Sequence, residues 1–143
     1  MKAIVQRVAS ARVEVEGRSV GEIGKGLLVL IAVGREDDEA ALRKAAERVA
    51  NLRIFSDADG KMNLSVREIE GAVLAVSNFT VLGDTRQRRP FFGASASGDT
   101  AQPLFEGFVS HLRTLVSQVE TGEFGADMRV SLVNDGPVTV VVE

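Results

Sequence analysis

Cysteine, tryptophan and tyrosine are absent from this chain of 143 residues, and histidine occurs once. Without cysteine there can be no disulfide framework and no thiolate nucleophile. A zinc site lacks ligands when only His111 remains, and we interpret that residue as a packed helix residue beside an apolar stripe. A Ser-His-Asp triad would need the same histidine, and no G-x-S-x-G nucleophile elbow accompanies it. The usual side-chain sets for hydrolysis are therefore missing.

Long apolar runs and phosphate-binding motifs are also absent. The apolar stretch at residues 26–34 is far shorter than the ~20 residues that span a bilayer, and it predicts a buried strand. The first residues hold an arginine within their apolar stretch and no small-residue cleavage site, which argues against a signal peptide. Neither G-x-x-x-x-G-K-[ST] nor G-x-G-x-x-G occurs. We expect a cytoplasmic protein that has no nucleotide-cradling loop and no membrane partner.

Positive charge is in slight deficit, with 17 lysines and arginines against 20 acidic residues. A net charge of −3 is the opposite of a bulk nucleic-acid binder, so any contact with RNA would need a local patch. The one candidate is DTRQRRP, where Arg86, Arg88 and Arg89 lie close together, although such short runs are more often solvated loops. Asp57 and Asp59 suggest calcium, but Gly60 and Lys61 do not fit an EF-hand loop, and a turn is favoured.

Hydrophobic residues make up 45% of the chain and support one folded domain over residues 1–143. Their periodicity predicts an α+β layered domain in which two amphipathic helices cover one side of a mostly antiparallel sheet. The expected strands cover 2–8, 11–15, 27–33, 72–82, 127–133 and 137–142, and the helices run from Asp37 or Asp38 to about Leu52 and from about Pro103 to about Val119. The expected apolar helix faces are Ala41, Leu42, Ala45, Ala46, Val49 and Ala50 in the first, and Leu104, Phe108, Leu112, Leu115 and Val119 in the second.

Polar residues interrupt the apolar strand at 72–82. A two-residue period would place Ser77 and Phe79 on one face, and Asn78 and Thr80 on the other. Backbone N–H groups and hydroxyls there could hold an ester carbonyl as charge develops on its oxygen. Hydroxyl residues at the end of a half-buried strand are also ordinary, and periodicity alone leaves both readings open.

A second unusual segment is NDGPVT near the C-terminus. Asp-Gly between two apolar runs is a strong signal for a β-hairpin turn. However, Pro137 stands where the returning strand should begin, and proline cannot donate a ladder hydrogen bond. The segment is therefore either a plain turn or a backbone device with a function.

With these segments in view, the chain resembles the D-aminoacyl-tRNA deacylases of the bacterial and eukaryotic type, the D-tyrosyl-tRNA deacylase family, nearly end to end. The likeness also includes MKAIVQRV, NLRIFSDADGKMNLSV, RQRRPFF and VETGEFGADMRVSLV, in that order. The family signatures are a Ser-Gln-x-Thr strand end and an Asn-x-Gly-Pro-x-Thr segment. The second is intact from Asn134 to Thr139, whereas the first has Asn78 in place of glutamine.

The resemblance implies a β/β/α sandwich-like fold and a homodimer with both active sites at the interface. It implies a cis bond between Gly136 and Pro137, a pair that each subunit inserts into the other's site. Their carbonyl oxygens would leave no room for an L side chain, whereas a D residue or glycine fits. Arg7 would hold this segment, with Asn134 and Thr139 in support.

The implied activity is that of a carboxylic ester hydrolase for chiral proofreading. Its substrate would be a D-amino acid esterified to the 3′-terminal adenosine of tRNA, and also glycine mischarged on tRNA-Ala. Amides around Phe79 and Thr80 would hold the carbonyl, with Ser77 and Asn78 completing the site. The ribose 2′-hydroxyl would help to activate water, and Thr80 would position rather than attack, since no base activates it. No metal, organic cofactor or DNA partner is implied.

Three alternatives stay open. A sister family of the same fold removes L-alanine from tRNA and carries a trans Gly-Pro bond. A catalytically silent binder of the tRNA 3′ end is the second, because Asn78 is one methylene shorter than glutamine and its contact could be lost. A plain structural module is the least favoured, since it gives no reason for SNFT and NDGPVT to occur together.

Overall fold

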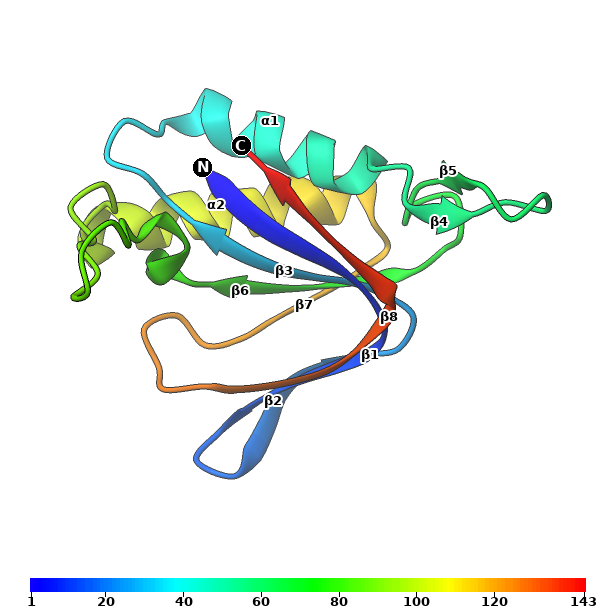
Figure 1. The fold of residues 1–143 in the computed structure, drawn as a ribbon, viewed down its shortest axis with the longest axis horizontal. Helices are drawn as coiled ribbons and strands as arrows, with labels where there is room; N and C mark the ends of the chain where they lie inside the picture. Colours follow the sequence, from blue (N-terminus) through cyan, green and yellow to red (C-terminus); the bar gives the residue numbers. More distant parts are fainter.

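The computed structural model describes residues 1–143, which form one mixed sheet of six strands, a small two-stranded sheet and two helices (Figure 1). The large sheet has the order β2-β1-β3-β6-β7, and β8 pairs with the other edge of β1. The elements are β1 Lys2–Val15, β2 Arg18–Ile23, β3 Gly26–Ala32, α1 Glu39–Asn51, β4 Phe55–Ser56, β5 Met62–Leu64, β6 Ala72–Ser77, the 3₁₀ helix η1 Phe79–Leu82, α2 Gly98–Leu115, β7 Gln118–Thr121 and β8 Arg129–Val142.

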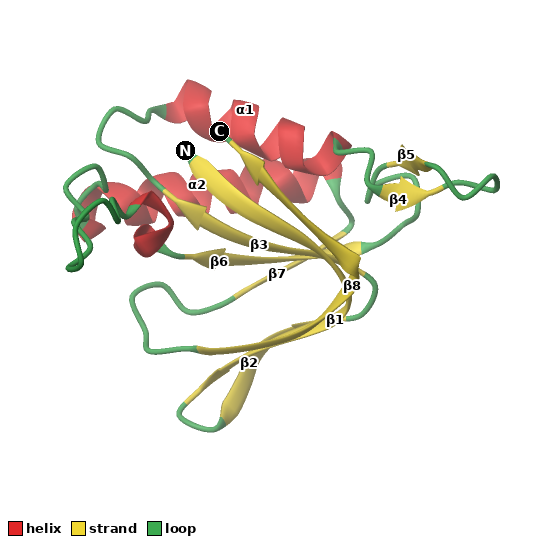
Figure 2. Cartoon of the chain, in the orientation of Figure 1, coloured by secondary structure: helices red, strands yellow, loops and turns green.

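Both helices lie on one face of the sheet, as the apolar periodicity predicted (Figure 2). The larger core fills the space between that face and the helices, and a smaller core lies on the opposite face. Three of the five pairings in the large sheet are antiparallel, whereas β3–β6 and β6–β7 are parallel. The expected α+β class is confirmed. No helix is long and apolar enough to cross a membrane.

Strand β1 is central to the large sheet, because it pairs with three other strands, β2, β3 and β8. The sequence predicted two strands, but the structure has one, which pairs with β3 in its first half and with β2 in its second. Its pairing with β8 shifts register between Gln6 and Ser10. Such bulges reverse which face a side chain points to. Val8 and Ala11, three residues apart on either side of the shift, therefore both pack in the smaller core, which explains the break in the alternation.

The first helix matches its prediction closely. Asp38 is the N-cap, and its carboxylate accepts a hydrogen bond from the Ala41 N–H at 2.9 Å. The expected apolar face is buried except for Ala41, which is half-buried.

The acidic segment after β4 is the expected turn. The Asp57 carboxylate accepts hydrogen bonds from the N–H groups of Asp59 and Lys61.

The second helix was predicted wrongly at both ends. It begins at Gly98 instead of Pro103, so Pro103 lies inside it, and it ends at Leu115. Its first turn is polar and carries no apolar period, which is why the sequence did not reveal it. Val119 belongs to β7, and Leu104 and Leu115 are only partly buried. The buried face is instead Ala101, Phe105, Phe108, Val109 and Leu112.

Two strand predictions near the candidate site were also wrong. Strand β6 ends at Ser77, and the next residues turn into η1, so the assumed two-residue alternation does not hold there. The Asp-Gly hairpin does not form, because β8 stays paired with β1 on both sides of it. Asn134 is opposite Val8 and Thr139 is opposite Gln6. The four residues 135–138 consequently bulge out against a single residue of β1.

Candidate active site

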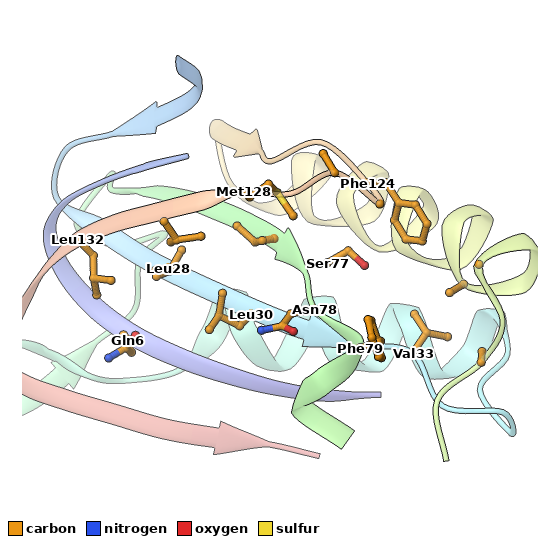
Figure 3. Close-up of a pocket in the computed structure, with 17 residues that line it drawn as sticks. Gln6, Leu28, Leu30, Val33, Ser77, Asn78, Phe79, Phe124, Met128 and Leu132 are labelled. Atoms are coloured by element: carbon orange, nitrogen blue, oxygen red, sulfur yellow. The ribbon is translucent and has the colours of Figure 1, made fainter. Parts of the chain in front are cut away.

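A cavity of about 560 Å³ opens on the sheet face opposite the helices (Figure 3). In Figure 3, Phe124 and Met128 lie across it from Leu30 and Asn78. Its lining is mostly apolar, and its polar side chains are those of Gln6, Ser77 and Asn78. No acidic, basic or histidine side chain lines it, so nothing in the cavity can serve as a general acid or base. The full lining is Gln6, Leu28, Leu30, Val33, Val76, Ser77, Asn78, Phe79, Ala96, Gly98, Ala101, Phe124, Gly125, Ala126, Met128, Val130 and Leu132.

The turn from β6 into η1 shapes one wall of the cavity. Asn78 has extended backbone angles and caps η1, and its side-chain oxygen accepts from the Thr80 N–H at 3.2 Å. The Thr80 hydroxyl donates to the same oxygen at 2.5 Å. Of the two amides expected to hold a carbonyl, that of Thr80 is therefore already engaged. The Phe79 N–H opens η1 and makes no hydrogen bond among the turns and loops, so it is free to donate.

Contacts from the loop before α2 hold Phe79 in place. The Phe92 ring meets the Phe79 ring edge to face, with centroids 5.3 Å apart. The Ser95 hydroxyl donates to the Phe79 carbonyl at 2.9 Å. The sequence had not singled out Phe92 or Ser95. A Phe-Phe pair and a serine in a loop carry no local signal of a contact with a residue 13 or 16 positions away.

The Gly136–Pro137 peptide bond is cis, as the resemblance implied. The Arg7 side chain lies beneath it, with Nε donating to the Asp135 carbonyl at 3.1 Å and Nη1 to the Ile54 carbonyl at 2.7 Å. The Asp135 carboxylate lies 3.6 Å from Nε. Arg7 therefore ties the bulge to the loop that follows α1.

The two ends of the bulge are joined through Asn134. Its side-chain amide donates to the carbonyls of Arg7 and Val138, at 2.9 and 3.0 Å. The Thr139 hydroxyl contacts the Asn134 oxygen at 3.5 Å and accepts from the Gln6 amide at 3.2 Å. Gly136 has φ +131°, and a Cβ there would stand 2.9 Å from Val138 and 3.0 Å from Arg7, so only glycine fits.

The structure thus gathers the predicted site residues into two groups. Ser77, Asn78 and Phe79 line the cavity, with Thr80 beside them. Gly136 and Pro137 lie in the bulge and are held by Arg7, Asn134 and Thr139, and none of these five residues lines the cavity of the same chain. Gln6 touches both groups, since it lines the cavity and donates to Thr139. Alternation in β1, which points Gln6 away from Val5 and Arg7, was the one signal for it.

The model of the family described as D-Tyr-tRNA(Tyr) deacylase matches residues 4–143. The chain belongs to this family. The D-aminoacyl-tRNA deacylase of Symbiobacterium thermophilum is 55% identical over 100% of this chain and 95% of its own length. That of Thermosipho africanus is 53% identical, covering 100% and 97%, and that of Escherichia coli O81 is 54% identical, covering 97% of each chain.

Solved structures agree with the fold. A c-Myc DNA unwinding element binding protein has a TM-score of 0.96 at 36% identity, over 100% of this chain and 98% of that one. A probable eukaryotic D-amino acid tRNA deacylase has a TM-score of 0.82 at 19% identity, covering 99% and 97%. The family, the fold class and the assignment to the hydrolases are confirmed.

Proposed function

We propose that this chain hydrolyses the ester bond of D-aminoacyl-tRNA and releases the free D-amino acid and tRNA. The observation that carries the proposal is the pairing of a free Phe79 N–H with a cavity that holds no acid, base or metal-ligand cluster. An activated ester needs little more than a polarised carbonyl and a positioned water. The high identity to deacylases over the whole chain supports the same activity.

The Phe79 N–H is the donor for the ester carbonyl. A fixed amide aimed at the oxygen stabilises the charge that develops during attack, and removing one such donor costs about 10²–10³ in rate. Asn78 supports this donor indirectly, because it caps η1 and fixes the direction of its first N–H. The Thr80 hydroxyl donates a hydrogen bond to the Asn78 side-chain oxygen, which makes Thr80 a positioning residue and not a nucleophile. Ser77 ends β6 at the cavity wall and offers a hydroxyl to the substrate.

The proton acceptor for the attacking water comes from the substrate. No titratable group lines the cavity, whereas the terminal ribose carries a 2′-hydroxyl next to the ester. The apolar part of the cavity takes the adenine of the terminal nucleotide, because a flat base packs well against side chains such as Phe124 and Met128. This places the 3′ ester near η1.

Selection against L-amino acids requires a second copy of the chain. Asp135, Gly136 and Pro137 are exposed, and the bulge is held by Arg7 and lies outside its own cavity, so it is available as a preformed insert. In a homodimer the Gly136 and Pro137 carbonyls of one subunit would face the substrate's α-carbon in the other subunit's cavity. There they exclude an L side chain and admit a D-amino acid or glycine, so glycine mischarged on tRNA-Ala is also a substrate.

Release of tyrosine from D-tyrosyl-tRNA and from L-tyrosyl-tRNA, measured side by side, tests this function. We expect rapid release from the D ester and none above the spontaneous rate from the L ester. Glycyl-tRNA-Ala should also be cleaved. Release from neither tyrosyl ester would refute the proposal, and release from L-alanyl-tRNA alone would assign the chain to the sister activity.

A further inference from the structure

The loop between η1 and α2 carries three arginines within residues 86–89 of a chain whose net charge is −3. Arg86 is used inside the loop, where its guanidinium binds both carboxylate oxygens of Asp84. This hydrogen bond holds the pKa of Asp84 below its usual value. Arg88 and Arg89 are exposed and form neither an ion pair nor a side-chain hydrogen bond within the chain. Two positive charges are thus left free for an anion from outside.

Phe91 is the most exposed large apolar side chain, at 69%. Its ring lies against Gly93, where a Cβ would come within 2.2 Å of the ring atom Cζ. The ring is therefore held close to the backbone at Gly93, while most of its surface is open to solvent. The neighbouring Phe92 instead packs beside Phe79 and Gly83. An exposed aromatic ring of this kind is a stacking surface for a nucleobase.

This loop is fastened to the candidate active site. Asp84 and Phe91 exchange two backbone hydrogen bonds, of 2.8 and 3.0 Å, which close the loop at its base. Next to Phe91, the Phe92 ring contacts the ring of Phe79. At the start of the loop, the Gly83 N–H donates to the Thr80 carbonyl at 2.9 Å. In Figure 1 the loop lies at the same end of the molecule as η1 and the start of α2. An RNA strand that leaves the cavity next to η1 passes this loop first.

We propose that this loop binds the single-stranded nucleotide that precedes the terminal adenosine of tRNA, with Phe91 stacking on its base and Arg88 and Arg89 contacting phosphates. This inference rests on the proposed function, since it assumes that the 3′ end occupies the cavity. Single-stranded RNA fits both features together, because it offers unstacked bases and closely spaced phosphates. A second copy of this chain fits less well, because covering Phe91 with protein would also desolvate two unpaired arginines.

The test compares D-tyrosyl-tRNA with 3′-O-(D-tyrosyl)adenosine, which has the ester and the terminal nucleoside but no preceding nucleotide. Phe91→Leu keeps an apolar side chain but removes the ring, and should raise KM for the tRNA about five- to tenfold with little change in kcat. Phe91→Tyr keeps the ring and should restore the wild-type KM. The rise in KM of Phe91→Leu should be confined to D-tyrosyl-tRNA and absent with 3′-O-(D-tyrosyl)adenosine.

The double variant Arg88→Gln with Arg89→Gln tests the phosphate contacts. We expect KM for tRNA to be about tenfold higher than in the wild type at low salt. We also expect the slope of log KM against log salt concentration to fall by about 1.4, because each phosphate contact with a single strand contributes about 0.7 to this slope. Arg43→Gln, on the outer face of α1, and Met62→Ser, on the exposed β5, are matched controls that should leave KM unchanged.

Three outcomes would overturn the inference. Equal losses on both substrates would show that the loop acts only through η1, and no loss on either would show that it makes no contact. Dissociation of the Phe91→Leu protein to a smaller species in sedimentation would show that a second copy covers Phe91. If the wild type cleaves neither substrate, the proposed function is refuted, but the inference about the loop is still open to a binding test. Binding of an uncharged CCA-ended minihelix, followed by fluorescence anisotropy, then tests the loop: weaker binding by the variants supports it and unchanged binding refutes it.

Discussion

The turn at η1 and the bulge at residues 135–138 are both interruptions of a strand, but they are held in different ways. The Asn78 side chain bonds to a residue two positions away, so the cap of η1 is local, and Phe92 and Ser95 hold Phe79 from 13 and 16 positions away. The bulge depends on Arg7, 128 residues away, and on Asn134 contacting both Arg7 and Val138. The first lines a cavity, whereas three of the four residues of the second are exposed. In the proposed function, the first receives the substrate and the second enters the cavity of another copy of the chain.

The largest expected effect comes from removing the Phe79 N–H. Proline at the first position of a helix costs little and suits the extended backbone of Asn78, so Phe79→Pro should fold while losing the donor. We expect kcat to fall about 10²–10³-fold relative to Phe79→Ala, which loses the ring but keeps the N–H. Single-turnover release from D-tyrosyl-tRNA measures this ratio. Equal rates for the two variants would remove Phe79 from its assigned role.

A change in the bulge should have the next largest effect. Gly136→Ala places a Cβ against Val138 and Arg7 at a positive φ, and the carbonyls of the segment must shift. A displacement of this kind costs about 10² in rate on D-tyrosyl-tRNA. Gly24→Ala is the control, because a Cβ there meets nothing within 4 Å. Full activity of Gly136→Ala would show that the bulge does not contribute to the site.

Arg7→Lys should have a moderate effect. A lysine has one nitrogen and cannot bond the Asp135 and Ile54 carbonyls together as the guanidinium does. We expect kcat/KM to fall about tenfold and the free energy of unfolding to fall by about 1–3 kcal/mol. Urea denaturation measures the change in the free energy of unfolding. The exposed control Arg43→Lys should lie within about 0.5 kcal/mol of the wild type. A change in stability without a change in rate would separate Arg7 from the site.

The smallest effect should come from Asn78→Gln, which restores the residue usual in the family. The asparagine already caps η1, and glutamine is a poorer cap, so we expect a rate within a few-fold of the wild type and a stability lower by about 1 kcal/mol. Parallel rate and melting measurements would show this. A rise of more than tenfold would mean that the shorter side chain has weakened the site.

Features determined by local sequence were predictable. The Asp38 cap, the apolar face of α1 and the buried strand β3 all follow from short-range patterns, and they agree with the structure. The start of α2 was not predicted, because Ser97 is followed by a polar turn without an apolar period. The end of β6 was not predicted either, because capping of η1 by Asn78 ends the strand and its alternation.

Features that depend on distant pairing were not predictable from periodicity. The Asp-Gly signal pointed to a hairpin, but β1 offers β8 an uninterrupted edge, and pairing with it replaces the hairpin by a bulge. The same limit applies to the site. Motif resemblance supplied Ser77 to Thr80 and the Gly136–Pro137 pair, whereas Gln6 and Ser95 join it only through contacts across the fold.

The central claim is that the bulge of one chain completes the cavity of another, and mixed dimers test it most directly. Phe79→Pro and Gly136→Ala proteins are each nearly inactive in this account. Mixed and allowed to exchange, they should recover about a quarter of the wild-type rate, because half of the dimers are mixed and one of their two sites is whole. Intact mass spectrometry confirms that mixed dimers form. Mixed dimers without recovered activity would contradict the claim.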